Sequence, residues 1–202
     1  MNRHPRASFY ARSGVNCSEF TKNSDTRLAV IGGGSWGTTL ASLVCRNAHV
    51  TLWARDSDVV DEINSSNTHS RYLEGLNLNP LLSATTSLEE AVTDAHAVFM
   101  AIPSHNFRSV FEQVAPLVPS GAPIISMTKG LEASTQKRMT EVIHEYCPDH
   151  PVGVLTGPNL AREILEGKAA ASVLALDDAS ADWLQPILNV GLFRDYRNDD
   201  VV

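Results

Sequence analysis

The sequence has few cysteines and no pattern of metal ligands. Its 202 residues contain three cysteines, at positions 17, 45 and 147, and this odd, widely spaced set excludes a Cys-x-x-Cys motif and a disulfide framework. The seven histidines are scattered, and none of them forms a His-x-x-x-His pair, so we expect no metal site. Unpaired thiols of this kind are typical of a reduced, cytoplasmic protein.

Long hydrophobic runs and an excess of basic residues are also absent. No apolar stretch approaches the length of a membrane span, and no segment has the apolar core of a secretion signal. The net charge is −7, divided as +2 over residues 1–26 and −9 over residues 27–202. An acidic body argues against a nucleic-acid surface, so an anionic ligand has to be held by a few well-placed cations and backbone N–H groups.

Residues 1–26 differ in composition from the rest of the chain. They have no hydrophobic periodicity and no acidic residue before Glu19, and arginine and serine are frequent. We expect a disordered N-terminal extension, whether as a plain tail or as the product of an upstream start that is not normally used; the composition also resembles an organellar transit peptide. Residues 27–202 have enough apolar residues to form one domain.

Short apolar runs alternate with helical patterns from residue 27 onward. This order predicts an α/β fold of the Rossmann type, a doubly wound and mainly parallel sheet with helices on both faces. Ligands of such sheets bind beyond the carboxyl ends of the strands. We expect strands at 28–31, 50–53, 81–85, 97–102, 123–127, 152–155, 171–176 and 193–197, and, after the first helix, helices at 58–64, 87–91, 105–115, 135–146, 160–166 and 180–189, with a polar loop at 65–80.

A glycine-rich turn follows the first predicted strand. Gly32, Gly34 and Gly37 have the spacing Gly-x-Gly-x-x-Gly between an apolar run and a helical pattern, as a dinucleotide-binding turn requires. The first glycine allows a tight turn, the second lets the backbone approach a pyrophosphate, and the third lets the helix pack on the strand. An ordinary turn that binds nothing is the alternative, but the strand–turn–helix context favours coenzyme binding.

The second strand ends at Ala54 and Arg55, where an NAD-specific site usually has an acidic residue. A guanidinium at this position suits a 2′-phosphate, so the sequence favours NADP(H) and leaves NAD(H) possible. Asp56 follows directly and would oppose a phosphate if it turned inward. Arg55 could also be a solvated surface residue.

Two further loops lie at the predicted ligand edge. Lys129 follows a buried strand, and its ammonium could hold a substrate oxygen or polarise a carbonyl. Gly157 and Pro158 end another strand and begin a helix, so Asn159 and Ala161 could offer free N–H groups to the same cleft. A plain loop lysine and a simple Gly-Pro helix start are the alternatives.

The ordered motifs GGGSWGTTLA, LWAR, IPS, KGLE, GPNLARE and LFRDYRNDDVV resemble the N-terminal half of the bacterial-type NAD(P)-dependent glycerol-3-phosphate dehydrogenases, from about Arg27 to the last residue. The resemblance implies reversible reduction of dihydroxyacetone phosphate to sn-glycerol 3-phosphate for phospholipid synthesis, by a protein that forms a homodimer when full length. It implies the following roles: Ser35, Trp36, Arg55 and Ala161 contact the coenzyme, Lys129 contacts coenzyme and substrate, and Gly157 and Asn159 border the substrate.

The chain departs from this family pattern in three respects. Many members have a second basic residue where Asp56 stands, and a small hydroxyl residue where Asn159 stands. The family also has a helical C-terminal domain with a proton-transferring lysine, and the sequence stops at Val202, before that domain would begin. Two other hypotheses remain: a non-catalytic dinucleotide-binding module, and another reductase with the same N-terminal fold, such as a ketopantoate reductase.

Overall fold

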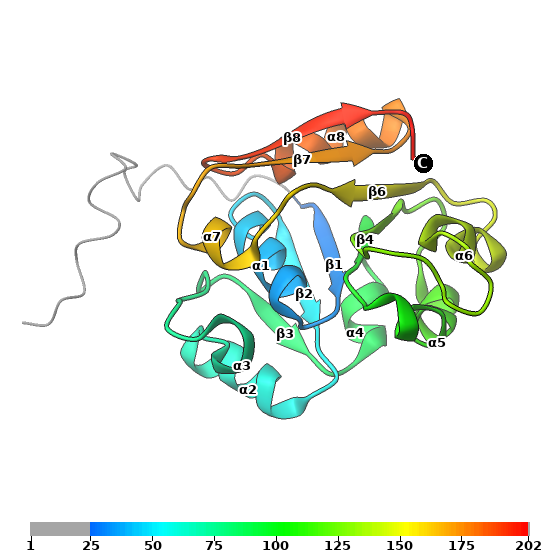
Figure 1. Cartoon of the computed structure of the whole chain (residues 1–202). Helices are drawn as coiled ribbons and strands as arrows, with labels where there is room; N and C mark the ends of the chain where they lie inside the picture. The colour runs from blue at the N-terminus through cyan, green and yellow to red at the C-terminus, as the bar shows by residue number, and fades with distance from the viewer. Residues whose placement is uncertain (1–24, 202) are drawn as a thin grey trace, which may run out of the picture.

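The computed structural model describes residues 25–201 (Figure 1). The expectation for the N-terminal extension therefore lies outside the described residues, apart from Asp25 and Thr26, and so does Cys17. Thr26 already takes part in the sheet, because its carbonyl accepts a hydrogen bond from the N–H of His49 at 2.9 Å. The sheet thus includes a residue that we expected to belong to the N-terminal extension.

One sheet of eight strands forms the centre of the domain, in the order β3-β2-β1-β4-β5-β6-β7-β8. The first six strands are parallel, β7 is antiparallel to β6, and β8 is parallel to β7. This confirms the predicted fold class. The strands are β1 (Arg27–Ile31), β2 (His49–Trp53), β3 (Ser83–Thr85), β4 (Ala97–Met100), β5 (Ile124–Ser126), β6 (Val152–Thr156), β7 (Ala170–Ala175) and β8 (Phe193–Asn198).

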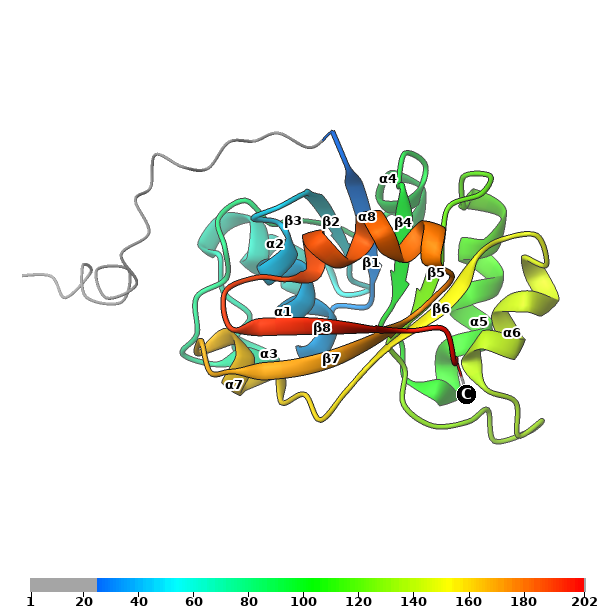
Figure 2. The same ribbon diagram turned by 90° about the horizontal axis from the view of Figure 1, so that it is seen from above.

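Helices cover both faces of the sheet, and each face has its own apolar core (Figure 2). The first core joins the sheet to α1, α2, α3, α7 and α8, and the second joins it to α4, α5 and α6. No helix of residues 25–201 has the length and apolar character needed to cross a bilayer. The helices are α1 (Ser35–Val44), α2 (Ser57–Ser66), α3 (Ser70–Leu73), α4 (Leu88–Val92), α5 (Ser104–Val114), the 3-10 helix η3 (Ala115–Leu117), α6 (Met139–Tyr146), α7 (Ala161–Leu165) and α8 (Asp178–Leu188).

Strand β1 shows why the central strands are continuous apolar runs. Leu28 and Val30 belong to the first core, whereas Ala29 and Ile31 belong to the second. All four side chains are buried, as expected for a parallel strand that is covered on both faces. The apolar run thus fixes β1 in the middle of the domain, and its carboxyl end leads directly into the glycine turn.

Two predicted segments differ from the structure. The helix expected at 135–146 begins at Met139, because Thr135 donates to the carboxylate of Glu132 and Gln136 has a left-handed φ of 57°. A short bridge between Leu131 and Arg138 closes this segment as a loop. The loop expected at 65–80 contains the four-residue helix α3, which is too short to show hydrophobic periodicity in the sequence. Elsewhere the bounds differ by at most two residues.

Candidate functional site

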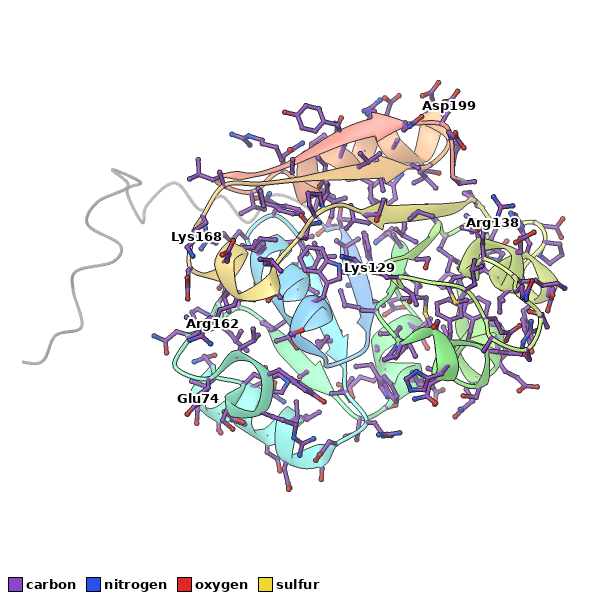
Figure 3. All side chains as sticks on the ribbon, viewed as in Figure 1. Glu74, Lys129, Arg138, Arg162, Lys168 and Asp199 are labelled. Atoms are coloured by element: carbon purple, nitrogen blue, oxygen red, sulfur yellow. The ribbon has the colours of Figure 1, made fainter. Side chains whose placement is uncertain are left out.

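A cleft of about 1120 Å³ lies at the carboxyl ends of the parallel strands. Lys129 is one of the residues that line it, and this residue is labelled near the middle of the view in Figure 3. All of the residues that the sequence selected line this cleft, although they come from four different loops and helix starts; they are Gly32, Gly34, Ser35, Trp36, Gly37, Arg55, Lys129, Gly157, Asn159 and Ala161.

The glycine turn is packed tightly against the protein at every glycine except one. Gly32 has a φ of +128°, and a Cβ there would lie 2.5 Å from the carbonyl oxygen of Ala101. A Cβ at Gly37 would lie 2.1 Å from the carbonyl oxygen of Gly32. A Cβ at Gly34, in contrast, would meet no atom within 4 Å. Gly34 therefore faces open space in the cleft, which fits a backbone that a dinucleotide phosphate has to approach.

The position between the first two motif glycines is constrained as well, and the sequence analysis missed it. A Cβ at Gly33 would lie 2.6 Å from the Cβ of Ala54, at the end of β2. The carbonyl of Gly33 accepts a hydrogen bond from Nε2 of His69 at 2.9 Å, and His69 is completely buried. Because the carbonyl can only accept, this contact selects the tautomer of His69 that is protonated on Nε2. No sequence signal links residues so far apart in the chain.

Three helices begin at the cleft without a side-chain cap. Gly34, Pro103 and Leu160 are the N-cap residues of α1, α5 and α7, and none of them provides a capping hydrogen bond. A fourth helix at the cleft, α2, is capped by the side chain of Asp56. Uncapped helix starts leave N–H groups free, and they carry the positive end of the helix dipole. The cleft is therefore suited to anionic groups.

Charged side chains strengthen this character. Among the described residues that line the cleft, Arg55, Arg71 and Lys129 are cations and Asp56 is the one carboxylate. The chain as a whole has a net charge of −7. The cleft is thus a cationic concavity in an acidic protein, an arrangement that attracts anionic ligands and selects against binding elsewhere on the surface.

Trp36 links the glycine turn to the far edge of the sheet. Its ring lines the cleft and packs edge-on against Phe193 of β8, with 6.0 Å between the ring centroids. Phe193 is buried, whereas Trp36 is half-buried. The contact fixes the orientation of the Trp36 ring and leaves one part of it available to a ligand.

Lys129 is positioned by its own loop. Thr128 donates a hydrogen bond of 2.6 Å to the carbonyl of Ile102, which ties the end of β5 to the loop after β4. Gly130 has a φ of +93°, a value that turns the chain away directly after the lysine. The exposed ammonium of Lys129 lies 3.5 Å from the carbonyl oxygen of Gly157, so it spans the cleft between the β5 and β6 loops.

An ion-pair network holds the far side of the Lys129 loop. Arg108 of α5 binds both carboxylate oxygens of Glu132, at 2.7 and 2.8 Å, and Thr135 donates to the same carboxylate. Arg108 also pairs with Glu145, which in turn pairs with Lys137. The hydrogen bonds from Arg108 and Thr135 lower the pKa of Glu132 to about 2, so this carboxylate is ionised at neutral pH. The network thus fixes the loop by charge rather than by apolar burial.

The Asn159 loop is closely packed on β7. A Cβ at Gly157 would lie 2.6 Å from the carbonyl oxygen of Ala171. The side-chain Nδ2 of Asn159 donates to Oγ of Ser172 at 2.6 Å, and its Oδ1 has no hydrogen-bond partner among the described residues. The carbonyl of Ala161 accepts a long hydrogen bond of 3.4 Å from Thr39 of α1. Asn159 therefore lines the cleft while its amide nitrogen points toward the sheet.

A buried carboxyl group lies behind Asn159. Asp195 of β8 is the cross-strand neighbour of Ser172 and is 4% exposed. Burial raises the pKa of Asp195 to about 7, against a smaller lowering effect of the Ser172 hydroxyl. Neither carboxyl oxygen of Asp195 has a hydrogen-bond partner at suitable distance and angle among residues 25–201. Asp195 therefore titrates near neutral pH, one hydroxyl away from the cleft-lining amide.

Comparisons with known proteins point to one family of dehydrogenases. Residues 27–182 match the family model described as the N-terminus of NAD-dependent glycerol-3-phosphate dehydrogenase. A glycerol-3-phosphate dehydrogenase [NAD(P)+] of Sphingopyxis alaskensis is 51% identical over 177 residues, covering 87% of this chain and 53% of that protein. One from Acinetobacter baylyi is 44% identical over 182 residues, covering 89% of this chain and 51% of its own length.

A solved structure shows the same fold and the same partial overlap. The crystal structure of glycerol-3-phosphate dehydrogenase from Coxiella burnetii superimposes with a TM-score of 0.80 at 31% identity, covering 87% of this chain and 55% of that one. The chain thus spans about half the length of the curated relatives that it matches. The family model covers most of the described domain, and the chain therefore belongs to the NAD-dependent glycerol-3-phosphate dehydrogenase family, of which it matches the N-terminal part.

Proposed function

We propose that this chain binds NADP(H) or NAD(H) in the cleft and forms the coenzyme-binding part of an NAD(P)-dependent sn-glycerol-3-phosphate dehydrogenase. This activity interconverts dihydroxyacetone phosphate and sn-glycerol 3-phosphate, the backbone precursor of phospholipids. The observation that carries the proposal is that residues selected from four separate segments line one cationic cleft at the carboxyl edge of a parallel sheet. Family membership supports the assignment of substrate class.

The glycine turn and α1 are proposed to hold the coenzyme pyrophosphate. The open space at Gly34 would admit the phosphates, and the uncapped start of α1 would donate N–H groups from Ser35 and its neighbours. Gly32 and Gly37 keep the turn close to β4 and α1. Trp36, Arg55, Lys129 and Ala161 complete the proposed set of coenzyme contacts, because each of them lines the same cleft.

Lys129, Gly157 and Asn159 are proposed to form the substrate end. A bound NADPH supplies the hydride. The ammonium of Lys129 would stabilise negative charge that develops on the substrate oxygen, and it would also attract the phosphate of an anionic substrate. Its contact with the Gly157 carbonyl at 3.5 Å directs it across the cleft, toward the loop that carries Asn159. Asn159, which lines the cleft, would border the substrate beside this charge.

Proton transfer is proposed to lie outside the part of the family that this chain matches. The relatives are about twice as long as the matched region, and the family resemblance implies a proton-transferring lysine in their helical C-terminal domain. A cytoplasmic location and a homodimeric full-length enzyme belong to the same proposal. The free thiols of Cys45 and Cys147, both buried, are consistent with a reducing compartment.

Coenzyme titration and a turnover assay together test the proposal. We expect the 202-residue chain to bind NADPH, measured by nucleotide fluorescence, and to oxidise it negligibly with dihydroxyacetone phosphate. A positioned general acid typically contributes on the order of 10²–10⁴-fold, so the lack of such a group, together with lost substrate orientation, would leave the turnover of this chain far below that of a full-length relative. Absence of NADPH and NADH binding would contradict the proposed site, and rapid turnover would contradict the proposed division of roles.

A further inference from the structure

Arg55 is not the only arginine at the end of β2. Arg55, Asp56 and Arg71 all line the same end of the cleft, although Arg71 comes from helix α3. Nη1 of Arg71 lies 2.7 Å from Oδ2 of Asp56, and their side chains are 52% and 37% exposed. Arg55 makes no ion pair with any residue of the described part of the chain. Two guanidinium groups therefore flank one carboxylate.

The carboxylate of Asp56 is already engaged on two sides. One oxygen accepts from the N–H of Asp58 at 3.1 Å and caps helix α2, and the other pairs with Arg71. The hydrogen bond from Arg71, followed by the one from Asp58, holds the pKa of Asp56 below its usual value. Asp56 is thus an ionised carboxylate whose charge is compensated by Arg71, and its repulsion of a nearby phosphate is correspondingly reduced.

The position of Arg71 is fixed relative to the glycine turn. His69, two residues earlier, is buried and donates to the carbonyl of Gly33. Ser70 donates its N–H and its hydroxyl to Glu62, at 2.7 and 2.9 Å. The carbonyl of Glu74 accepts two hydrogen bonds of 3.1 Å from Arg162 (Figure 3). The backbone on both sides of Arg71 is therefore held in place, while its guanidinium reaches the cleft edge.

We propose that Arg71 is a second phosphate-binding arginine, which selects coenzymes that carry a 2′-phosphate on the adenosine ribose. The ion pair with Asp56 occupies one side of the Arg71 guanidinium. The remaining N–H donors of this group are available to bind phosphate oxygens. Arg71 and Arg55 together give the end of β2 a net positive charge, although Asp56 lies between them. The inference rests on the proposed coenzyme site and adds the group that sets its specificity.

The ion pair also predicts what happens when Arg71 is removed. Asp56 would then face the cleft beside Arg55 with its Arg71 partner lost, and a carboxylate at the end of β2 favours a ribose 2′-hydroxyl over a 2′-phosphate. NADPH binding should therefore weaken, whereas NADH binding should stay the same or improve. A purely structural role of Arg71 makes a different prediction, since a displaced α3 would affect both coenzymes alike.

The test compares four variants of the 202-residue chain. Arg71→Gln removes the charge, and Asp56→Asn removes the carboxylate while asparagine can still cap α2. The double variant removes both charges. Arg162→Gln is the matched control, because Arg162 braces the same segment through Glu74 but does not line the cleft. Each variant is titrated with NADPH, NADH, 2′,5′-ADP and 5′-AMP, with circular dichroism as the check on folding.

We expect Arg71→Gln to weaken NADPH and 2′,5′-ADP binding by about tenfold or more, the scale of one hydrogen bond to a charged group. NADH and 5′-AMP binding should not weaken. Asp56→Asn should retain or strengthen NADPH binding, and Arg162→Gln should not alter the NADPH to NADH ratio. An equal loss for both coenzymes in Arg71→Gln, an unchanged ratio, or a ratio shift in Arg162→Gln would overturn the inference. If the unmodified chain binds neither coenzyme, the proposed function fails as well.

Discussion

Gly34 and Gly37 belong to one motif, yet the structure assigns them different tasks. A Cβ at Gly34 would meet no protein atom within 4 Å, whereas a Cβ at Gly37 would lie 2.1 Å from the carbonyl oxygen of Gly32 and 2.9 Å from the Cβ of Ala101. Replacing each glycine by valine therefore separates coenzyme binding from folding. We expect Gly34→Val to abolish NADPH binding in a folded protein, and Gly37→Val to destabilise the fold.

The expected stability changes follow from opposing contributions. Gly34 has a φ of −80° and a ψ of 178°, which any residue adopts. A valine at position 34 restricts the unfolded chain, which stabilises the folded state by about 0.4–1 kcal/mol. Loss of the glycine N-cap of α1 costs a comparable amount, so the free energy of unfolding should change by less than about 1 kcal/mol. At Gly37 the clashing atom is backbone and cannot swing aside. Overpacking costs about 1–3 kcal/mol or more, which exceeds the gain in helix propensity of less than about 1 kcal/mol.

Urea unfolding followed by circular dichroism measures both stabilities, and fluorescence titration measures NADPH binding. A loss of 1–3 kcal/mol should lower the melting temperature of a domain of this size by about 2–4 °C per kcal/mol. Gly33 offers a control, since its Cβ would meet Ala54 rather than the cleft, so Gly33→Val should also act on the fold. Normal NADPH binding by Gly34→Val, or unchanged stability of Gly37→Val, would refute the assignment of Gly34 to coenzyme binding and of Gly37 to folding.

Three further predictions concern charge. Arg55→Asp should lower NADPH affinity relative to NADH by roughly tenfold to a hundredfold, because a hydrogen bond to a charged group contributes about 1.5–3 kcal/mol; an unchanged affinity ratio would show that Arg55 faces solvent. Asp195 has a pKa raised to about 7, so the folded state binds a proton that the unfolded state has lost, and stability should fall as pH rises from about 4 to about 7. Asp195→Asn should remove this dependence and stabilise the protein at pH 8 by up to about 4 kcal/mol, measured by urea unfolding between pH 4 and pH 8; equal pH profiles would contradict the burial argument. Arg108→Ala should loosen the Lys129 loop, seen as faster hydrogen exchange at residues 130–136, whereas Arg138→Ala, which removes a pair with Glu141 at the start of α6, should not. The Glu132 pKa of about 2 means that this contribution is present above about pH 4.5 and is lost as pH falls toward 2.

Much of the fold can be predicted from local patterns in the sequence. The apolar runs at Leu28–Ile31 and 97–102 predict buried parallel strands because covering both faces demands apolar residues at every position. The helix expected at 87–91 has a local start signal, because the hydroxyl of the N-cap residue Ser87 accepts a hydrogen bond from the N–H of Glu90. The reversal of direction between β6 and β7 has no such signature, since a short apolar strand looks the same in either orientation.

The site was predictable where its residues follow strand ends, and unpredictable where contacts join distant segments. Lys129 and Gly157 were found because the carboxyl ends of parallel strands meet at one edge. His69 and Arg71 were missed because they lie in a polar loop with no periodicity, and their partners Gly33 and Asp56 are fixed only by tertiary packing. The helix predicted at Thr135 failed for a related reason, because hydrogen bonds to Glu132 outweighed local helix propensity.

The separation of paired strands along the chain indicates the order in which the sheet assembles. Strands β7 and β8 are joined by α8 alone and pair directly, for example Ala170 with Phe193, whereas β1 reaches β4 across four helices and two strands, pairing Leu28 with Ala97. Low contact order favours early formation, so the β7–α8–β8 unit is expected to form as a local nucleus and the β1–β4 pair later. The glycine turn follows β1 and packs on Ala101 after β4, which means that the coenzyme cleft is completed only when this slow pairing is made. A coenzyme that recognises the finished cleft should therefore slow unfolding more than it speeds folding.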